Sequence, residues 1–251
     1  MKTVSYDVIV IGGGPGGYTA GIRAGQLGLK TAVIERQARL GGTCLLVGCI
    51  PTKTMLHIAD VWEHFSNPAQ YGIACQDPAL DLAKVVERKN GIVNRHAKGV
   101  EMLFRKNKVE RIQGEASLEG RGRVKVRGAD GERTLEAKHI ILATGSEARM
   151  LPGLEPDPER ILTNVEILEL RQVPKSMIVI GSGAVGAEFA SMFNRFGTKV
   201  TLVEMLPRLA PLMDASIGEG LAWSLAQRGV NVFSGTRVAA VIDQFFFESL
   251  T

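Results

Sequence analysis

The sequence predicts an α/β fold in which two β-α-β units follow one another along the chain. The first unit is YDVIVIGGGPGGYTAGIRAGQLGLKTAVIE, residues 6–35, and the second is SMIVIGSGAVGAEFASMFNRFGTKVTLVE, residues 176–204. Each begins with a short apolar, β-branched run, turns through glycines, continues as a helical segment and returns to a second apolar run. Corresponding residues are separated by a constant 169 positions, so the chain contains an internal repeat.

The composition is that of a folded protein. The chain has 251 residues, of which 45% are hydrophobic and 22% charged, and these values exclude a disordered chain. The net charge of +4 is spread along the sequence, so we expect no nucleic-acid partner. No run approaches about 18 consecutive apolar residues, and the amino terminus has no signal-peptide pattern. We therefore expect no membrane span and a cytoplasmic location.

Each repeat carries three glycines at the spacing G-x-G-x-x-G between a strand and a helix. They are Gly12, Gly14 and Gly17 in the first copy and Gly181, Gly183 and Gly186 in the second. In a dinucleotide-binding unit the first glycine permits the tight turn, the second lets the backbone approach a pyrophosphate, and the third lets the helix pack closely. The helix amino terminus then stabilises the phosphates. One such motif is a weak signal, but two in register predict two dinucleotide sites.

An acidic residue ends the second strand of each repeat, 23 positions after the first glycine. These residues are Glu35 and Glu204, and each carboxylate is expected to accept a hydrogen bond from a ribose hydroxyl. Two sites in one chain indicate electron transfer between two cofactors. Flavoproteins often place the FAD site at the amino terminus, so we assign FAD to the first site and a nicotinamide cofactor to the second. Glu204 favours NAD over NADP, because its carboxylate repels a 2′-phosphate.

The chain has three cysteines, of which Cys44 and Cys49 form a close pair and Cys75 stands alone. The pair could be metal ligands, a structural bridge or a redox pair. Metal binding needs more ligands than the surrounding sequence offers, so we expect no metal site. A bridge across so short a loop constrains little. A redox pair suits the position after an FAD-type unit, but on one ideal helix the two side chains point about 140° apart. A bridge therefore requires an irregular turn, and Gly48 permits one.

GGTCLLVGCIPTK, residues 41–53, closely resembles the redox-active segment of the pyridine nucleotide–disulfide oxidoreductases. IILATGSEARMLPG, residues 140–153, resembles the second flavin fingerprint of that family. Together with the two glycine motifs, four motifs stand in the family's order over about residues 4–240. Within the family the resemblance is greatest to the dihydrolipoamide dehydrogenases. Leu46 stands where the family usually has Asn, and Thr52 where dihydrolipoamide dehydrogenases usually have Ser.

The resemblance implies roles for individual residues. Cys44 is similar to the thiol that exchanges with the substrate sulfur, and Cys49 to the thiol beside the flavin. Lys53 resembles the lysine near the flavin, and Glu188 resembles its ion-pair partner. The implied FAD-binding residues are Gly12, Gly14, Gly17, Glu35, Arg36, Gly42, Thr43, Lys53, Gly114, Ala116, Thr144, Gly145 and Ser146. The implied NAD-binding residues are Gly181, Gly183, Val185, Gly186, Glu188, Glu204 and Val238.

The implied activity is that of a flavoprotein disulfide oxidoreductase. Electrons pass from dihydrolipoamide, free or on a lipoyl domain, through a Cys44–Cys49 disulfide and FAD to NAD⁺. Two alternatives stay open. One is a mercuric or glutathione reductase-type flavoenzyme with the electron flow reversed, and the other is a catalytically inactive nucleotide-binding fragment.

The resemblance also sets the expected domain organisation. We expect two Rossmann-like domains: an FAD-binding domain over residues 1–147, with the redox helix and a small β-meander, and an NAD-binding domain over 148–251. Family chains are nearly twice as long, so the second domain is expected to be incomplete, and residues 243–251 do not resemble the expected strand. The family implies a homodimer, but its dimerisation domain and the His–Glu pair on it are not found. We therefore expect this chain alone to turn over dihydrolipoamide poorly. We expect helices over residues 52–66, 80–107 and 214–227, and short strands over 109–139.

Overall fold

Two compact units make up the chain in the computed structural model, which describes residues 4–129, 131–150, 153–157 and 159–239. The first unit comprises Met1–Thr54 and Glu87–Ala148, and the second comprises Met55–Val86 and Arg149–Thr251. The division between cofactor domains at residues 147 and 148 stays a prediction. The atypical tail, residues 243–251, lies outside the described residues.

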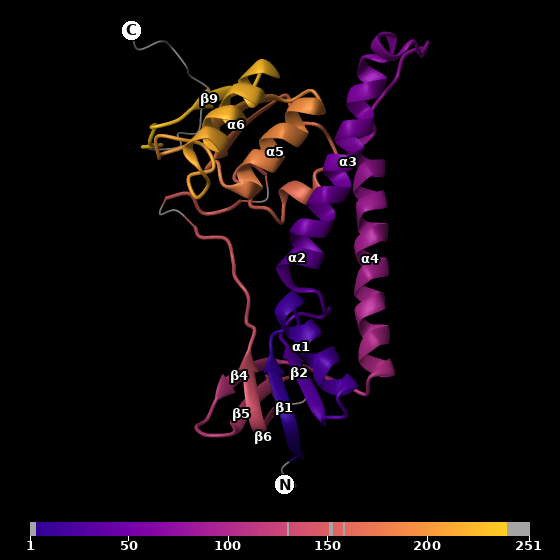
Figure 1. Cartoon of the computed structure of the whole chain (residues 1–251), viewed down its shortest axis with the longest axis vertical. Helices are drawn as coiled ribbons and strands as arrows, with labels where there is room; N and C mark the ends of the chain where they lie inside the picture. The colour runs from indigo at the N-terminus through magenta and orange to yellow at the C-terminus, as the bar shows by residue number, and fades with distance from the viewer. Residues whose placement is uncertain (1–3, 130, 151–152, 158, 240–251) are drawn as a thin grey trace. The chain divides into compact units, whose positions relative to one another are not determined.

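A six-stranded sheet forms the centre of the first unit, with the strand order β3-β2-β1-β6-β5-β4 (Figure 1). Neighbours among β3, β2, β1 and β6 pair in parallel, whereas β5 pairs antiparallel with both β4 and β6. The parallel strands therefore end at one edge of the sheet, where β1 lies between β2 and β6. The bounds are β1 Val4–Ile11, β2 Thr31–Glu35, β3 Glu110–Gln113, β4 Glu115–Leu118, β5 Arg123–Gly128 and β6 Gly131–Leu142.

Apolar residues cover both faces of this sheet, and this explains the continuous apolar runs in the sequence. Val10 and Val33 pack on one face with Val93 and Phe104 of the helix α4, Leu82–Lys106. On the other face Ile9, which is fully buried, belongs to a separate cluster. The other members of that cluster include Ile34, Ile112, Val124 and Leu135. Burial on both sides leaves only the strand ends and their loops available to a ligand.

The second unit contains a three-stranded parallel sheet of order β7-β8-β9. The helix α3, Cys49–Ser66, contributes Met55 and Ala59 to its core, where they join Phe193 and Leu202. The remaining bounds are β7 Ser176–Ile180, α5 Ala184–Arg195, β8 Lys199–Val203, α6 Ala215–Gln227 and β9 Asn231–Phe233, with short 3-10 helices at Pro68–Tyr71 and Ile167–Glu169.

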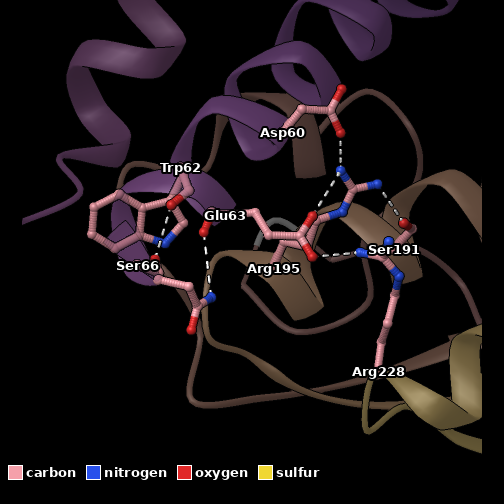
Figure 2. Close-up of polar contacts among 8 residues, drawn as sticks. Asp60, Trp62, Glu63, Ser66, Ser191, Arg195 and Arg228 are labelled. Atoms are coloured by element: carbon pink, nitrogen blue, oxygen red, sulfur yellow. Dashed lines mark hydrogen bonds and ion pairs between the residues drawn. The ribbon is translucent and has the colours of Figure 1, made fainter. Parts of the chain in front are cut away.

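A cluster of charged side chains joins α3 to α5 within the second unit (Figure 2). Arg195, at the end of α5, donates hydrogen bonds to Asp60 of α3 and, at 2.8 Å, to Ser191 Oγ. Glu63 lies 3.9 Å from Arg195 and accepts a 2.7 Å hydrogen bond from Arg228. The Arg195 side chain is only 14% exposed, so solvent screens this pair less than it screens an ordinary surface ion pair. The cluster fixes the carboxy-terminal half of α3 beside α5.

The repeat predicted from the sequence is confirmed as β1-α1-β2 and β7-α5-β8, where α1 spans Pro15–Gln26. The predicted helices are also present, and α6 follows Asp214 at its N-cap position. The helix expected to begin at residue 52 begins at Cys49, because Pro51 is tolerated in a first turn. One stretch in the described residues, Gly42–Ser66, is long and apolar enough to cross a membrane by length and composition alone. A core helix or a signal sequence can pass the same test; 28% of the apolar window is buried, and Leu45, Met55 and Ala59 are among the buried residues of this stretch.

We predict that Gly17→Ala destabilises the first unit, because a Cβ at this position would lie 1.7 Å from the carbonyl oxygen of Gly12. The loop or the helix must shift, and we expect a loss of about 1–3 kcal/mol in the free energy of unfolding. Gly16→Ala is the matched control. Its Cβ would make ordinary contact with Ala143 at 3.6 Å, so helix propensity should raise stability by up to about 1 kcal/mol. Chemical denaturation measures both variants, and equal stability of the two would contradict the close approach.

Candidate functional site

The two glycine loops have the same geometry. Gly12 and Gly181 have φ values of +108° and +99°, which L side chains rarely adopt. Gly14 and Gly183 are the N-cap residues of α1 and α5. A Cβ on Gly186 would lie 2.0 Å from the carbonyl oxygen of Gly181, as happens at the equivalent glycine of the first loop. Each loop therefore leads directly into a helix whose first N–H groups have no partner within the helix, the arrangement that binds phosphates.

A carboxylate at the end of the neighbouring strand accepts hydrogen bonds from the backbone of each glycine loop. Glu35 Oε2 accepts a 2.6 Å hydrogen bond from the Gly13 N–H, and its Oε1 accepts one of 2.8 Å from Gln37. Glu204 repeats this pattern with the N–H groups of Ser182 and Leu206, both at 2.8 Å. The Ser182 hydroxyl adds a third bond to Glu204, at 2.7 Å. The acidic residues that the sequence assigned to ribose binding thus also hold their own loops in shape.

The environment of Glu204 favours its ionised form. Burial by itself raises the pKa of this carboxyl group, but hydrogen bonds from the Leu206 N–H and from Ser182 outweigh it and lower the pKa below its usual range. Glu204 and Ser182 are 7% and 0% exposed, respectively. A fixed negative charge therefore stands at the end of β8.

A cavity of about 410 Å³ opens at the carboxyl edge of the first sheet. Eight predicted FAD-binding residues line it, namely Gly12, Glu35, Arg36, Gly114, Ala116, Thr144, Gly145 and Ser146. Ile11, Ile34, Glu115 and Glu147 complete the lining. Ligands of open α/β sheets bind at this edge, and the volume is that of a small-molecule site. Apolar side chains (Ile11, Ile34 and Ala116), glycine backbone and the Glu35 carboxylate, among a lining that also includes Glu115 and Glu147, fit the adenosine half of a dinucleotide.

The other predicted FAD-binding residues lie around this cavity or beyond it. A Cβ on Gly42 would lie 2.6 Å from the Cα of Gly14, so the helix α2, Gly42–Val47, begins against the first glycine loop. The Thr43 hydroxyl donates a 3.2 Å hydrogen bond to the Ser146 carbonyl. Lys53 is an exposed residue of α3 in the first unit, and Glu188 lies in α5 of the second.

The cysteine pair lies at a break between two helices. α2 ends at Val47 and α3 begins at Cys49, so Gly48 interrupts the helix as the sequence predicted. The reason is space rather than a left-handed backbone, because a Cβ on Gly48 would lie 2.8 Å from the Thr43 carbonyl oxygen and 3.3 Å from the Cys44 Cα. Cys49 lies close enough to Cys44 across this break to affect the pKa of the Cys44 thiol. In the described part of the chain, no group of three or more His, Cys, Asp or Glu side chains could hold a metal ion.

The thiols differ in their surroundings. Both are free, Cys44 being half-buried and Cys49 exposed. Burial raises the pKa of the Cys44 thiol, and the hydrogen bond and charge of Cys49 raise it further. Tyr18 of α1 is a neighbour that the sequence did not indicate. Its pKa is raised, first by burial and then by the negative charges of the two cysteine sulfurs.

The structure places the predicted NAD-binding residues in the second unit. Its glycine loop and Glu204 lie together at the end of the first two strands, and Val185, in the first turn of α5, is 57% exposed. Val238 is half-buried and follows β9. The sequence analysis missed Ser182, and a comparison with Gly13 at the equivalent position of the first repeat could have found it. It also missed Glu147, which directly follows Ser146 in the segment over residues 140–153 that resembles a flavin fingerprint.

Comparisons with known proteins agree with the geometry. The sequence profile described as pyridine nucleotide-disulphide oxidoreductase matches residues 6–246. Dihydrolipoyl dehydrogenase 3 of Pseudomonas aeruginosa is 48% identical over 239 residues, which cover 94% of this chain and 51% of that protein. Dihydrolipoyl dehydrogenase of Chlorobaculum parvum is 44% identical over 246 residues, covering 97% and 52% of the two chains.

Solved structures show the same relationship. LpdA of Mycobacterium tuberculosis has a TM-score of 0.84 at 29% identity and is matched over 95% of this chain and 52% of its own. RclA of Escherichia coli is an HOCl-induced flavoprotein disulfide reductase. The structure of its Cu(II) complex has a TM-score of 0.82 at 27% identity and is matched over 98% of this chain and 52% of its own. The chain thus spans about half the length of the curated relatives it matches.

We predict that Ser182→Ala lowers the free energy of unfolding at pH 7 by roughly 1–3 kcal/mol, because it removes a hydrogen bond to the ionised Glu204. The pKa of Glu204 is lowered in the folded state, so its contribution to stability is present above the unfolded-state pKa and is lost as the pH falls through the folded-state pKa. The difference between the variant and the unmodified chain should therefore be smaller at pH 3.

Chemical denaturation at the two pH values measures this difference. Ser176→Ala, at the exposed start of β7, is the matched control and should change little at either pH. If Ser182→Ala lowered the free energy of unfolding by the same amount at both pH values, the hydrogen bond to the ionised Glu204 would not be the cause of the loss.

Proposed function

Because the chain belongs to the pyridine nucleotide-disulphide oxidoreductase family, we propose that it acts as a flavoprotein disulfide oxidoreductase of the dihydrolipoyl dehydrogenase type. Its proposed substrate is a dithiol, on a small molecule or a lipoyl domain, and its proposed location is the cytoplasm. One observation carries the proposal. Cys44 and Cys49 lie on either side of the helix break at Gly48, in the same unit as the cavity whose lining fits adenosine.

The chemistry proposed for the cysteines is thiol–disulfide exchange. In the oxidised chain Cys44 and Cys49 share a disulfide, and a substrate thiolate attacks the Cys44 sulfur and releases the Cys49 thiolate. The second substrate thiol then displaces Cys44, so the substrate becomes a disulfide and loses two electrons and two protons. Both cysteines end as the free thiols that the structure describes.

The surrounding residues support this chemistry. Lys53 follows Cys49 by one helical turn in α3, and a positive charge there favours the thiolate form. FAD, when bound, would supply the two-electron acceptor for the dithiol, and NAD⁺ would be the final acceptor. Glu35 and Arg36 are proposed to bind the adenosine half of FAD, and the loop from Gly181 to Gly186 and Glu204 are proposed to bind NAD. The roles of Glu188, Val185 and Val238 stay predictions of the family resemblance.

The likeness to RclA supports a second candidate, a disulfide reductase in which electrons flow from the nicotinamide cofactor to the cysteines. The two candidate functions use the same residues and differ in the direction of electron flow between the cysteines and the nicotinamide cofactor. Both directions are measurable on the same preparation.

We predict that mild oxidation lowers the number of titratable thiols in the chain from three to one, leaving Cys75, and that dihydrolipoamide restores three. Chromatography of the purified chain measures bound FAD, and thiol titration after gel filtration counts the cysteines. On oxidation, the Cys49→Ser variant should form no intramolecular disulfide, whereas the number of titratable thiols in the Cys75→Ser variant should fall from two to none. A chain that retains FAD but keeps three thiols under oxidation would contradict the redox pair. Faster reduction by NADH than by dihydrolipoamide would favour the reductase.

We predict that Glu204→Gln weakens NADH binding and narrows the preference for NADH over NADPH, because the charge that opposes a 2′-phosphate is removed. Binding is followed by the fluorescence of the reduced nicotinamide in titrations with each cofactor. Glu35→Gln in the first repeat is the matched control, which should lower FAD affinity and leave the NADH to NADPH ratio unchanged. Tighter binding of NADPH than NADH by the unmodified chain would overturn the assignment.

A further inference from the structure

An ion pair between Arg36 and Glu147 spans the cavity of the first unit. Both residues line the cavity, and the guanidinium of Arg36 donates to the Glu147 carboxylate. Arg36 follows the end of β2, and Glu147 lies in the segment that follows β6. Since β1 lies between β2 and β6, the two residues come from opposite sides of the Gly12 loop at the end of β1. Their ion pair therefore crosses from one wall of the cavity to the other.

The backbone on both walls is held in place. On the β6 side, the Ala143 N–H donates a 2.8 Å hydrogen bond to the Ile11 carbonyl, and Ser146 accepts one from Thr43. On the β2 side, both carboxylate oxygens of Glu35 are hydrogen-bonded to backbone N–H groups. The two side chains are by contrast 58% and 72% exposed, for Arg36 and Glu147 respectively. Rotation of these side chains can open and close the span without movement of the walls.

The charges around the cavity explain why an ion pair between Arg36 and Glu147 is compatible with an adenosine bound beneath it. Adenine is neutral, and the lining of the cavity includes Glu35 and Glu115 besides Glu147. An unpaired Arg36 would turn freely in solvent, because a long exposed side chain loses rotamer entropy when it is held in one place. Glu147 supplies an anchor across the cavity and neutralises the guanidinium. Arg36 then lies over the cavity rather than away from it.

We propose that Glu147 is a positioning residue that holds Arg36 across the adenosine cavity and so slows both entry and exit of the adenosine half of FAD. This inference rests on the proposed function, since that function places FAD in this cavity. Exposed ion pairs are weak, so the expected effect is about two- to fivefold in rate. Because the closure affects entry and exit alike, the equilibrium affinity should change less than either rate.

The experiment measures FAD release from the purified 251-residue chain by the rise in flavin fluorescence after dilution into excess ADP. Glu147→Gln should release FAD about two- to fivefold faster than the unmodified chain. Raising the ionic strength should accelerate release from the unmodified chain, because salt screens an exposed ion pair, and should have little effect on the variant. Arg36→Gln combined with Glu147→Gln should release FAD no faster than Arg36→Gln alone, as expected for residues that act as one pair.

Glu132→Gln is the matched control, because Glu132 also forms exposed ion pairs, with Lys125 and Arg127, but lies outside the cavity lining. It should leave release unchanged. If the unmodified chain binds FAD and Glu147→Gln releases it at the same rate and with the same salt dependence, the inference is overturned and the proposed function stands. If the unmodified chain binds no FAD, the proposed function fails first and this inference fails with it.

Discussion

Both halves of the chain depend on the hydrogen bond between a strand-end carboxylate and the backbone of a glycine loop. Glu35 and Glu204 each reach from the second strand of a repeat to the loop that follows the first strand. Without this acceptor, a buried N–H group would lose its partner, at a cost of about 1–3 kcal/mol. The bond fixes where α1 and α5 begin and, in the first unit, where Arg36 leaves the strand. A residue proposed to bind a ligand is therefore also part of the scaffold, so substitutions of Glu35 or Glu204 must be interpreted with stability measured alongside binding.

The elements that could be predicted from the sequence are those whose cause is local. Glycine spacing indicated both loops because a Cβ at Gly17 or Gly186 meets backbone, and the cysteine spacing required the helix break at Gly48. Side-chain pairs distant in the sequence could not be predicted. Arg36 and Glu147 are 111 positions apart, and Asp60 and Arg195 are 135 apart. No periodicity links such residues, since only the assembled strand order and helix packing bring them together.

The surroundings of the cysteine pair bear on the role that the family resemblance implies for Cys44. The residue assigned to exchange with substrate, Cys44, is the more buried of the two, and its surroundings favour the protonated thiol. A raised thiol pKa makes the reduced pair less nucleophilic near neutral pH. Tyr18 lies close enough to both sulfurs for their charges to affect it. The charges of the two sulfurs therefore affect a titratable residue of α1.

The helix α3 begins at Cys49. Its carboxy-terminal half carries Asp60 and Glu63, whose carboxylates form ion pairs with Arg195. One residue inserted or deleted between Met55 and Asp60 would turn every later side chain of the helix by about 100° relative to Met55 and shift it by about 1.5 Å along the axis. Met55 could then not stay in the core while Asp60 faces Arg195. A change of side chain in the same stretch leaves this register intact. Related chains should therefore vary in composition across the four positions from Leu56 to Ala59 while keeping their number constant.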